Sequence, residues 1–335
     1  MLSSHRRGLL ATRTLLWVVC LGVLAATAGC SGVDLKKQYY PRETVKVESG
    51  AAGPVPAGPV DEPALSVAAL RVADACGLLD RETLKEFGKV ADKPYTHEPD
   101  RCGMTVEDPG GKDIRASLKI GESMNNMRDR ATGGIEGLPA EETRHDEKTC
   151  FVKVLTSDEP AMGMAVQVAY EGGDACATGR KAMSTIVKRL KEDPPKLTVA
   201  KGSLLDVDAC ETISEKVIRN HYGDDVRLLP FDLHGCLISG RGPSGGVQFR
   251  FGYPPTEEKN SRSVTLSGDV TAKSKFRGAD QAQCEVEWVH RKIDDDNFEV
   301  VKVEYARYSG DEDATSACKK AVAVAKVVVG KLPKP

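Results

Sequence analysis

Cysteine is the residue type whose spacing in this 335-residue sequence most clearly indicates chemistry. Eight of the ten cysteines form two sets of four. The sets are Cys76, Cys102, Cys150 and Cys176, then Cys210, Cys236, Cys284 and Cys318. The first two intervals are the same in both sets, so one common shift along the chain superimposes the first three members of each set, and only the last interval is longer in the second set. In an exported protein, an even number of cysteines predicts a disulfide framework.

The connectivity of each set has three possible forms. The interval from the first to the second cysteine is the same in both sets, whereas the last interval differs, and this favours pairing of first with second and third with fourth cysteine. The favoured bonds are Cys76 with Cys102, Cys150 with Cys176, Cys210 with Cys236, and Cys284 with Cys318.

The sequence gives little indication of a metal site or a redox-active site. No Cys-x-x-Cys pair is present, which argues against a zinc ribbon or a thiol oxidoreductase. The histidines after the leader share no metal-binding spacing and occupy no equivalent positions in the two halves; they are His97, His145, His221, His234 and His290. We therefore predict no metal site and no cofactor.

Two short motifs suggest activities that their positions do not favour. Residues 242–246 match the Gly-x-Ser-x-Gly nucleophile motif of hydrolases, which requires a strand that leads into a helix. Here the motif lies between two predicted strands, and residues 108–111 of the first half hold a turn sequence without serine at the same place. The acidic run at 294–297 lacks the spacing of a calcium loop, so a hairpin turn is the better interpretation. We predict that the protein is not an enzyme.

The first thirty residues indicate export. Residues 1–13 carry three arginines and no acid, and the apolar run at 15–24 is too short to span a bilayer, as in a secretory signal peptide. Small residues then precede Cys30, an arrangement that resembles the bacterial lipobox. Two palmitate-type acyl chains on Cys30 would anchor the protein stably. One alternative is cleavage at the Ala-x-Ala sequence of 26–28, which would release a secreted protein. A second open question is whether Arg6 and Arg7 direct twin-arginine export.

The remaining sequence divides into a tether and two copies of one domain. The expected parts are a signal peptide at 1–29, a lipidated N-terminus and flexible tether at 30–64, a first domain at 65–195 and a second at 196–335. Each copy is predicted to be α+β, with an antiparallel sheet flanked by N-terminal and C-terminal helices. In the first copy the expected elements are helices at 80–87 and 175–191 and strands at 102–107, 114–120, 150–155 and 165–170. In the second copy they are a hairpin over 235–253, strands at 284–290 and 298–308, and a helix at 314–331.

The pattern of these elements resembles a known domain family. Asp74-x-Cys76-x-Leu78-Leu79, followed by a second cysteine that opens a hairpin, is similar to the uncharacterised lipoprotein domain of actinobacterial cell envelopes. The first copy fits this pattern better than the second, in which residues 211–213 replace the Gly-Leu-Leu opening. The resemblance implies an envelope lipoprotein and carries no known activity.

Composition excludes several other classes of protein. With 47 basic and 49 acidic residues, the chain lacks the positive charge of a nucleic-acid binder. We expect a non-catalytic binding or interaction module, anchored by Cys30 to the extracytoplasmic face of the cell membrane, whose partner is another envelope protein or a small ligand. The alternatives are the solute-binding component of a transporter and an envelope hydrolase with an unrecognised site.

Overall fold

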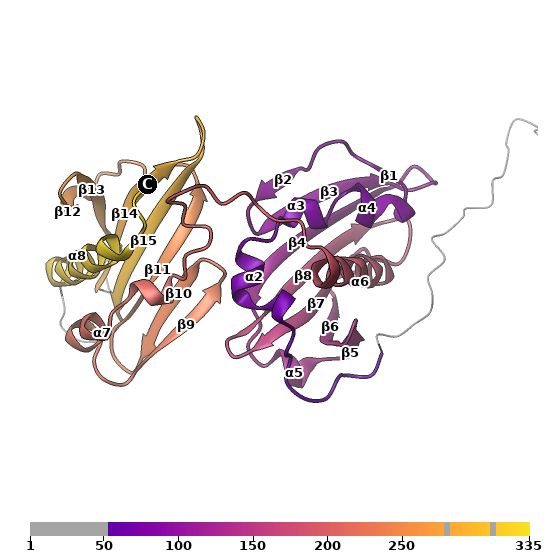
Figure 1. Ribbon diagram of the computed structural model, residues 1–335, viewed down its shortest axis with the longest axis horizontal. Coiled ribbons are helices and arrows are strands. Elements are labelled where there is room, and N and C mark those ends of the chain that lie inside the picture. The colour runs from indigo at the N-terminus through magenta and orange to yellow at the C-terminus, as the bar shows by residue number, and fades with distance from the viewer. Residues whose placement is uncertain (1–52, 278–281, 309–312) are drawn as a thin grey trace, which may run out of the picture. The chain divides into compact units, whose positions relative to one another are not determined.

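A computed structural model of the chain describes residues 53–277, 282–308 and 313–335. It contains two α+β domains, each with an antiparallel sheet and a long C-terminal helix (Figure 1). The expected signal peptide at 1–29 and the expected lipid attachment residue, Cys30, lie outside the described residues.

The first domain holds an eight-stranded sheet within residues 89–170, a part of the chain that is described throughout. Its strand order is β1-β3-β4-β8-β7-β6-β5, with β2 also paired to β3. The strands are β1 (Lys89–Val90), β2 (Thr96–Glu98), β3 (Arg101–Glu107), β4 (Asp113–Ser123), β5 (Gly133–Ile135), β6 (Leu138–Arg144), β7 (Thr149–Asp158) and β8 (Ala161–Tyr170).

In the second domain the described strands form a seven-stranded sheet of order β12-β13-β14-β15-β11-β10-β9. They are β9 (Val226–Asp232), β10 (Gly235–Gly240), β11 (Ser244–Gly252), β12 (Ser261–Ser267), β13 (Val270–Arg277), β14 (Ala282–Lys292) and β15 (Phe298–Arg307).

The two sheets share one topology, which confirms the duplication. In both sheets, one hairpin begins at the second cysteine and another begins at the third. The later strands of these two hairpins pair with each other, as β4 with β8 and β11 with β15. Two further strands then extend the sheet beyond β7 and beyond β14. The sequence predicted the four central strands of each copy, and the outer strands were not predicted.

Helices cover one face of each sheet. Helix α6 (Ala175–Glu192) packs on β7 and β8, and α8 (Ala314–Lys331) packs on β14 and β15 (Figure 1). Asp174 and Asp313 cap these helices by accepting hydrogen bonds from backbone N–H groups of the first turn. The shorter helices are η1 (Pro63–Leu65), α2 (Val67–Arg71), α3 (Ala75–Leu78), α4 (Arg81–Leu84), η2 (Lys85–Phe87), α5 (Met127–Arg130), η3 (Cys210–Thr212) and α7 (Glu215–His221).

Four disulfides join the helical segments to the strands. The bonds are Cys76–Cys102, Cys150–Cys176, Cys210–Cys236 and Cys284–Cys318, each with a Cα–Cα distance of 5.0 Å. These are the pairs that the constant interval favoured. Within each domain, one bond fixes the N-terminal helical segment to the first hairpin, and the other fixes the C-terminal helix to the second hairpin.

A buried core lies between helix and sheet in each domain. In the first it includes Leu118, Val166 and Ile186, and in the second it includes Trp288 and Tyr305. Alternation of buried and exposed residues along the strands places the apolar side chains on the helix side of the sheet. On the other face of the first sheet, a smaller buried cluster contains Met124, Met127, Leu155 and Ala165.

The described part of the expected tether, residues 53–64, contacts the first domain. Asp158 accepts a hydrogen bond from the backbone N–H of Val60 at 2.8 Å, and it is bound by two nitrogens of Arg128 at 2.8 and 2.9 Å. A third Arg128 nitrogen donates to the carbonyl oxygen of Pro56 at 3.4 Å. This end of the segment is therefore fixed to the domain that follows it.

The segment that connects the two domains forms hydrogen bonds with the first domain at its start and with the second domain further along. The carbonyl oxygen of Pro195 accepts from the N–H of Asp74 at 2.9 Å. Further on, the fully buried carboxylate of Glu299 accepts from the Ser203 hydroxyl at 2.6 Å and from the N–H of Leu204 at 2.9 Å. The linker residues are thus part of the folded structure.

Candidate functional site

The disulfides leave no cysteine thiol among the described residues. Glu142, Cys150 and Cys176 place possible ligand atoms within 4.8 Å of one another. The two sulfur atoms are bonded to each other, however, and metal binding by cysteine requires thiolates.

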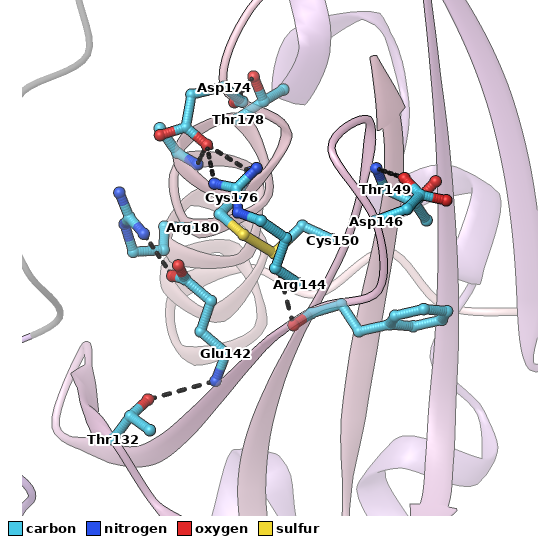
Figure 2. The surroundings of a disulfide bond; sticks show 12 residues. Thr132, Glu142, Arg144, Asp146, Thr149, Cys150, Asp174, Cys176, Thr178 and Arg180 are labelled. Carbon is cyan, nitrogen blue, oxygen red and sulfur yellow. Dashed lines mark hydrogen bonds and ion pairs between the residues drawn. A yellow bond between two sulfur atoms is a disulfide. The ribbon is translucent and has the colours of Figure 1, made fainter. Parts of the chain in front are cut away.

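The surroundings of this disulfide explain the position of the Glu142 carboxylate. Figure 2 shows the Glu142 carboxylate directed at Arg180, with which it forms an ion pair. Asp174, at the start of α6, accepts a hydrogen bond from Arg144 at 2.9 Å as well as from the N–H of Cys176. The charged side chains near Cys150 therefore have partners within the domain, and they stabilise the junction of strand and helix.

The two short motifs lie at hairpins, as the sequence predicted, and the first of them runs from the turn into the following strand. Ser244 begins β11 immediately after the turn from β10, so no helix follows it. Asp294 accepts hydrogen bonds from the N–H groups of Asp296 and Asn297 at 3.0 and 2.9 Å, which closes the turn between β14 and β15. Ser244 is therefore not on a strand-to-helix elbow, and residues 294–297 form a hairpin turn.

The five histidines after the leader lie at separate places in the described structure. His145 lies in the turn between β6 and β7, edge-on to the ring of Phe151, and His221 ends α7. His290 bonds to the carbonyl oxygen of Gly202 at 3.0 Å. His97 lies on β2, and His234 lies in the turn between β9 and β10.

One cavity lies on the face of the second sheet that α8 does not cover. We call it the apolar groove; its volume is about 330 Å³. It is lined by Phe231, Leu237, Ser244, Gly245, Gly246, Val247, Gln248, Lys302, Glu304 and Tyr308. Leu237 stands between the fully buried Cys236 and Ile238 on β10, so its side chain points to the opposite face.

Exposed apolar side chains border this groove. Leu237 is 39% exposed, its cross-strand partner Leu229 is 43% exposed, and Tyr308 is 60% exposed. Elsewhere on the same face the side chains are charged and paired, as in Arg250 with Glu287 at 2.9 Å. The apolar residues therefore stand out against a polar surface.

A second cavity of about 240 Å³ contains residues from equivalent turns of both domains. We call it the turn pocket; it is lined by Glu98, Pro99, Asp100, Lys119, Asp232, His234, Gln248, Phe249, Arg250 and Phe251. His234 is buried, with 4% of its surface exposed. Burial lowers the pKa of its imidazole to about 4 and raises the pKa of the neighbouring Asp232 carboxyl.

The sequence alone indicates His234 only as an isolated histidine, and no motif marks Glu98, Asp100 or Asp232. A signal was available, because the common shift that relates the cysteines of the two copies also places Glu98 on Asp232 and Asp100 on His234. The residue types differ between the copies, and only the structure shows that both turns line one pocket.

Comparison with known proteins adds little to these observations. A scan against protein-family models gave no match, and a search of curated protein sequences gave none. Among solved structures, the di-domain ARO/CYC StfQ from the steffimycin biosynthetic pathway aligns with 82% of this chain and 96% of its own, at 12% identity and a TM-score of 0.19. No conclusion about fold or function rests on so low a score.

Within residues 53–277, 282–308 and 313–335, no helix is long and apolar enough to cross a membrane.

Proposed function

We propose that the protein is a lipid-anchored extracytoplasmic lipoprotein and that its second domain binds another envelope protein without catalysis. The observation that carries the binding function is the apolar groove. The groove is large enough for a side chain of a partner, and its border residues are the exposed apolar side chains that protein interfaces bury.

The chemistry of the groove selects the partner's side chain. Its lining includes Gly246, which has no side chain, and the aromatic side chains of Phe231 and Tyr308. A leucine or aromatic side chain from a partner would remove this apolar surface from water, which is the main favourable contribution to such association. Lys302 and Glu304 would border the contact with polar groups.

The anchor and the compartment rest on sequence features. The leader, the position of Cys30 and the resemblance to envelope lipoproteins support export and lipidation. The four disulfides are consistent with an oxidising compartment.

Site-specific photo-crosslinking in intact cells tests the groove. A photoreactive residue in place of Leu229 is expected to give a defined crosslinked product, and the substitution Leu237→Glu in the same chain is expected to abolish it. A photoreactive residue at the exposed Lys319 on α8 is the matched control and should give no such product. Equal crosslinking at Lys319, or a product that persists with Leu237→Glu, would contradict a docking role for the groove.

A further inference from the structure

The turn pocket differs from the apolar groove because polar groups line it. Several of these groups come from equivalent turns of the two domains. In the first copy β2 and β3 meet at the turn that holds Asp100, and in the second β9 and β10 meet at the turn that holds His234. The backbone carbonyl oxygens of these two residues accept equivalent hydrogen bonds. That of Asp100 accepts from the N–H of Ile120 at 2.8 Å, and that of His234 accepts from the N–H of Phe249 at 2.9 Å. The pocket is therefore a consequence of the duplication.

His234 is the residue of this pocket whose buried side chain lacks hydrogen-bond partners within the described part of the chain. Neither ring nitrogen has a hydrogen-bond partner among the described residues, although both nitrogens are buried. The ring packs edge-on against the ring of Phe251, with ring centroids 4.9 Å apart. Buried polar atoms of native proteins nearly always have partners, so an unpaired imidazole that lines a cavity indicates a group that enters the cavity.

The carboxylates of the pocket divide into those with a cationic partner and those without. Asp100 forms an ion pair with Lys119, so this carboxylate is neutralised. Asp232 and Glu98, which are equivalent in the two copies, form no ion pair with any described side chain. Asp232 instead accepts hydrogen bonds from the N–H of His234 at 2.8 Å and, at 3.4 Å, from the amide of Gln248.

The cations near the pocket are already engaged. Lys119 is bound to Asp100, and the Arg250 guanidinium donates to Glu287 at 2.9 Å. The pocket thus presents two unneutralised carboxylates and one neutral imidazole that can accept a hydrogen bond. An anion would meet these carboxylates unfavourably, whereas an ammonium group would both neutralise a carboxylate and donate to His234.

From this arrangement we infer that the turn pocket binds a small organic diammonium ion. One ammonium group binds Asp232 and donates to the ring of His234, and the other binds Glu98. The inference is independent of the apolar groove, because the two cavities share only Gln248 among their lining residues. It adds a small-ligand site to the proposed protein-binding function.

Nuclear magnetic resonance of the mature, disulfide-bonded chain in detergent tests this site. The chain is labelled with ¹⁵N-histidine, His234 is assigned with the variant His234→Gln, and putrescine is the probe. Putrescine is expected to shift the ring-nitrogen signals of His234 saturably. Butylamine, with a single ammonium group, should bind about tenfold or more weakly, since one charge-assisted hydrogen bond contributes about 1.5–3 kcal/mol.

Two conservative variants separate the carboxylates. Asp232→Asn keeps an oxygen that can accept from the N–H of His234, and it should weaken both amines about tenfold or more. Glu98→Gln changes an exposed residue, and it should weaken putrescine to the level of butylamine while butylamine is unaffected. Unchanged signals from the other histidines verify that each variant is folded.

Three results would overturn the inference. His234 signals that do not move with putrescine would show a cavity filled by water only. An equal shift with 1,4-bis(trimethylammonio)butane, which has the same charge and no N–H donor, would show an ionic-strength effect. Putrescine binding that is unchanged in Asp232→Asn would show that the ligand lies elsewhere.

Discussion

Leu233 of the second domain packs directly over Gly121 of the first. A Cβ atom on Gly121 would overlap Cγ and both Cδ atoms of Leu233, and Leu233 belongs to the buried core cluster of the first domain. Nearby, Arg71 donates from Nε to the carbonyl oxygen of Leu233 at 2.9 Å. The turn that holds Leu233 is thus held by both a close apolar contact and a hydrogen bond.

This contact makes Gly121→Ala a specific test of the junction. Gly121 has a φ of 72° and Gly111 has a φ of 73°, yet only Gly121 has a neighbour where a side chain would lie. Both alanine variants bear the cost of positive φ, about 1–3 kcal/mol. Gly121→Ala should lose about a further 1–3 kcal/mol from overpacking against Leu233. Urea unfolding of the two variants measures the difference, and equal losses would contradict the contact.

Stability should depend on pH through His234. Burial is the largest cause of its lowered pKa of about 4; Arg71 and Lys119 also disfavour the protonated ring, whereas Asp100 and Glu299 favour it. The unfolded ring takes up its proton near pH 6.5 and the folded ring only near pH 4. The free energy of unfolding should therefore fall by about 3 kcal/mol as the pH falls from 6.5 to 4.

The variant His234→Gln isolates this contribution. Glutamine does not titrate, so the variant should lose the decrease between pH 6.5 and pH 4. The control variant His145→Gln, in the turn before β7, should retain it. The free energy of unfolding, measured by urea at several pH values, would refute the assignment if the slopes of the wild type and His234→Gln were the same.

The buried carboxylate of Glu299 should be the most sensitive polar site of the second domain. Besides Ser203 and Leu204, it pairs with Arg291, so its loss would leave a largely buried cation without its partner. We expect Glu299→Gln to lower the free energy of unfolding by about 3–5 kcal/mol. The control Glu257→Gln alters an exposed pair with Lys273 and should leave stability unchanged. Similar unfolding midpoints for both variants would contradict the role given to Glu299.

Asp158 should control whether residues 53–60 stay bound to the first domain. A hydrogen bond from Arg128 holds the pKa of the Asp158 carboxyl below its usual value. Because that pKa is lower in the folded state, the stabilisation is complete above about pH 4 and is lost as the pH falls through the folded value. The protection factor of the Val60 amide in hydrogen exchange, which corrects for the pH dependence of the intrinsic rate, should be high at pH 7, low in Asp158→Ala at pH 7, and lower in the wild type at pH 3 than at pH 7. An unchanged rate in the variant would contradict the contact.

Each disulfide should stabilise its domain to a similar extent. The bonded cysteines are 26 or 34 residues apart in sequence, which the chain-entropy model converts to about 3–4 kcal/mol per bond. We expect the double variant Cys284→Ala and Cys318→Ala to lose about this amount in urea unfolding. Peptide mapping without reduction checks the pairing, and a fragment that joins Cys102 to Cys150 would contradict it.

Much of the fold could be predicted from local sequence features. Asp80 and Asp174 precede helical segments as N-caps, and the cysteine intervals identified both the duplication and the favoured pairing. Where a strand alternates regularly, as β7 and β14 do, its position was predicted within a few residues. These features are local, so one sequence suffices to find them.

The missed elements depend on tertiary contacts. Strands β12 and β13 carry mostly polar and small residues and become strands by pairing with the edge of the sheet, as Lys273 does opposite Glu287. The turn pocket likewise depends on two turns far apart in sequence, and Asp232 or His234 alone has no recognisable motif. The shift that superimposes the cysteines could have related these positions, but it could not show that both turns line a single cavity.

The most direct test of the proposed function is to measure, by mass spectrometry, the N-terminal peptide of the mature protein purified from the membranes of the cells that produce it. The account predicts a chain that begins at Cys30 and carries a thioether-linked diacylglycerol. It also predicts that Cys30→Ala moves the protein from the membrane fraction to the soluble fraction. A mature chain that begins at Gly29 with an unmodified Cys30, or a Cys30→Ala variant that stays in the membrane fraction as before, would contradict it.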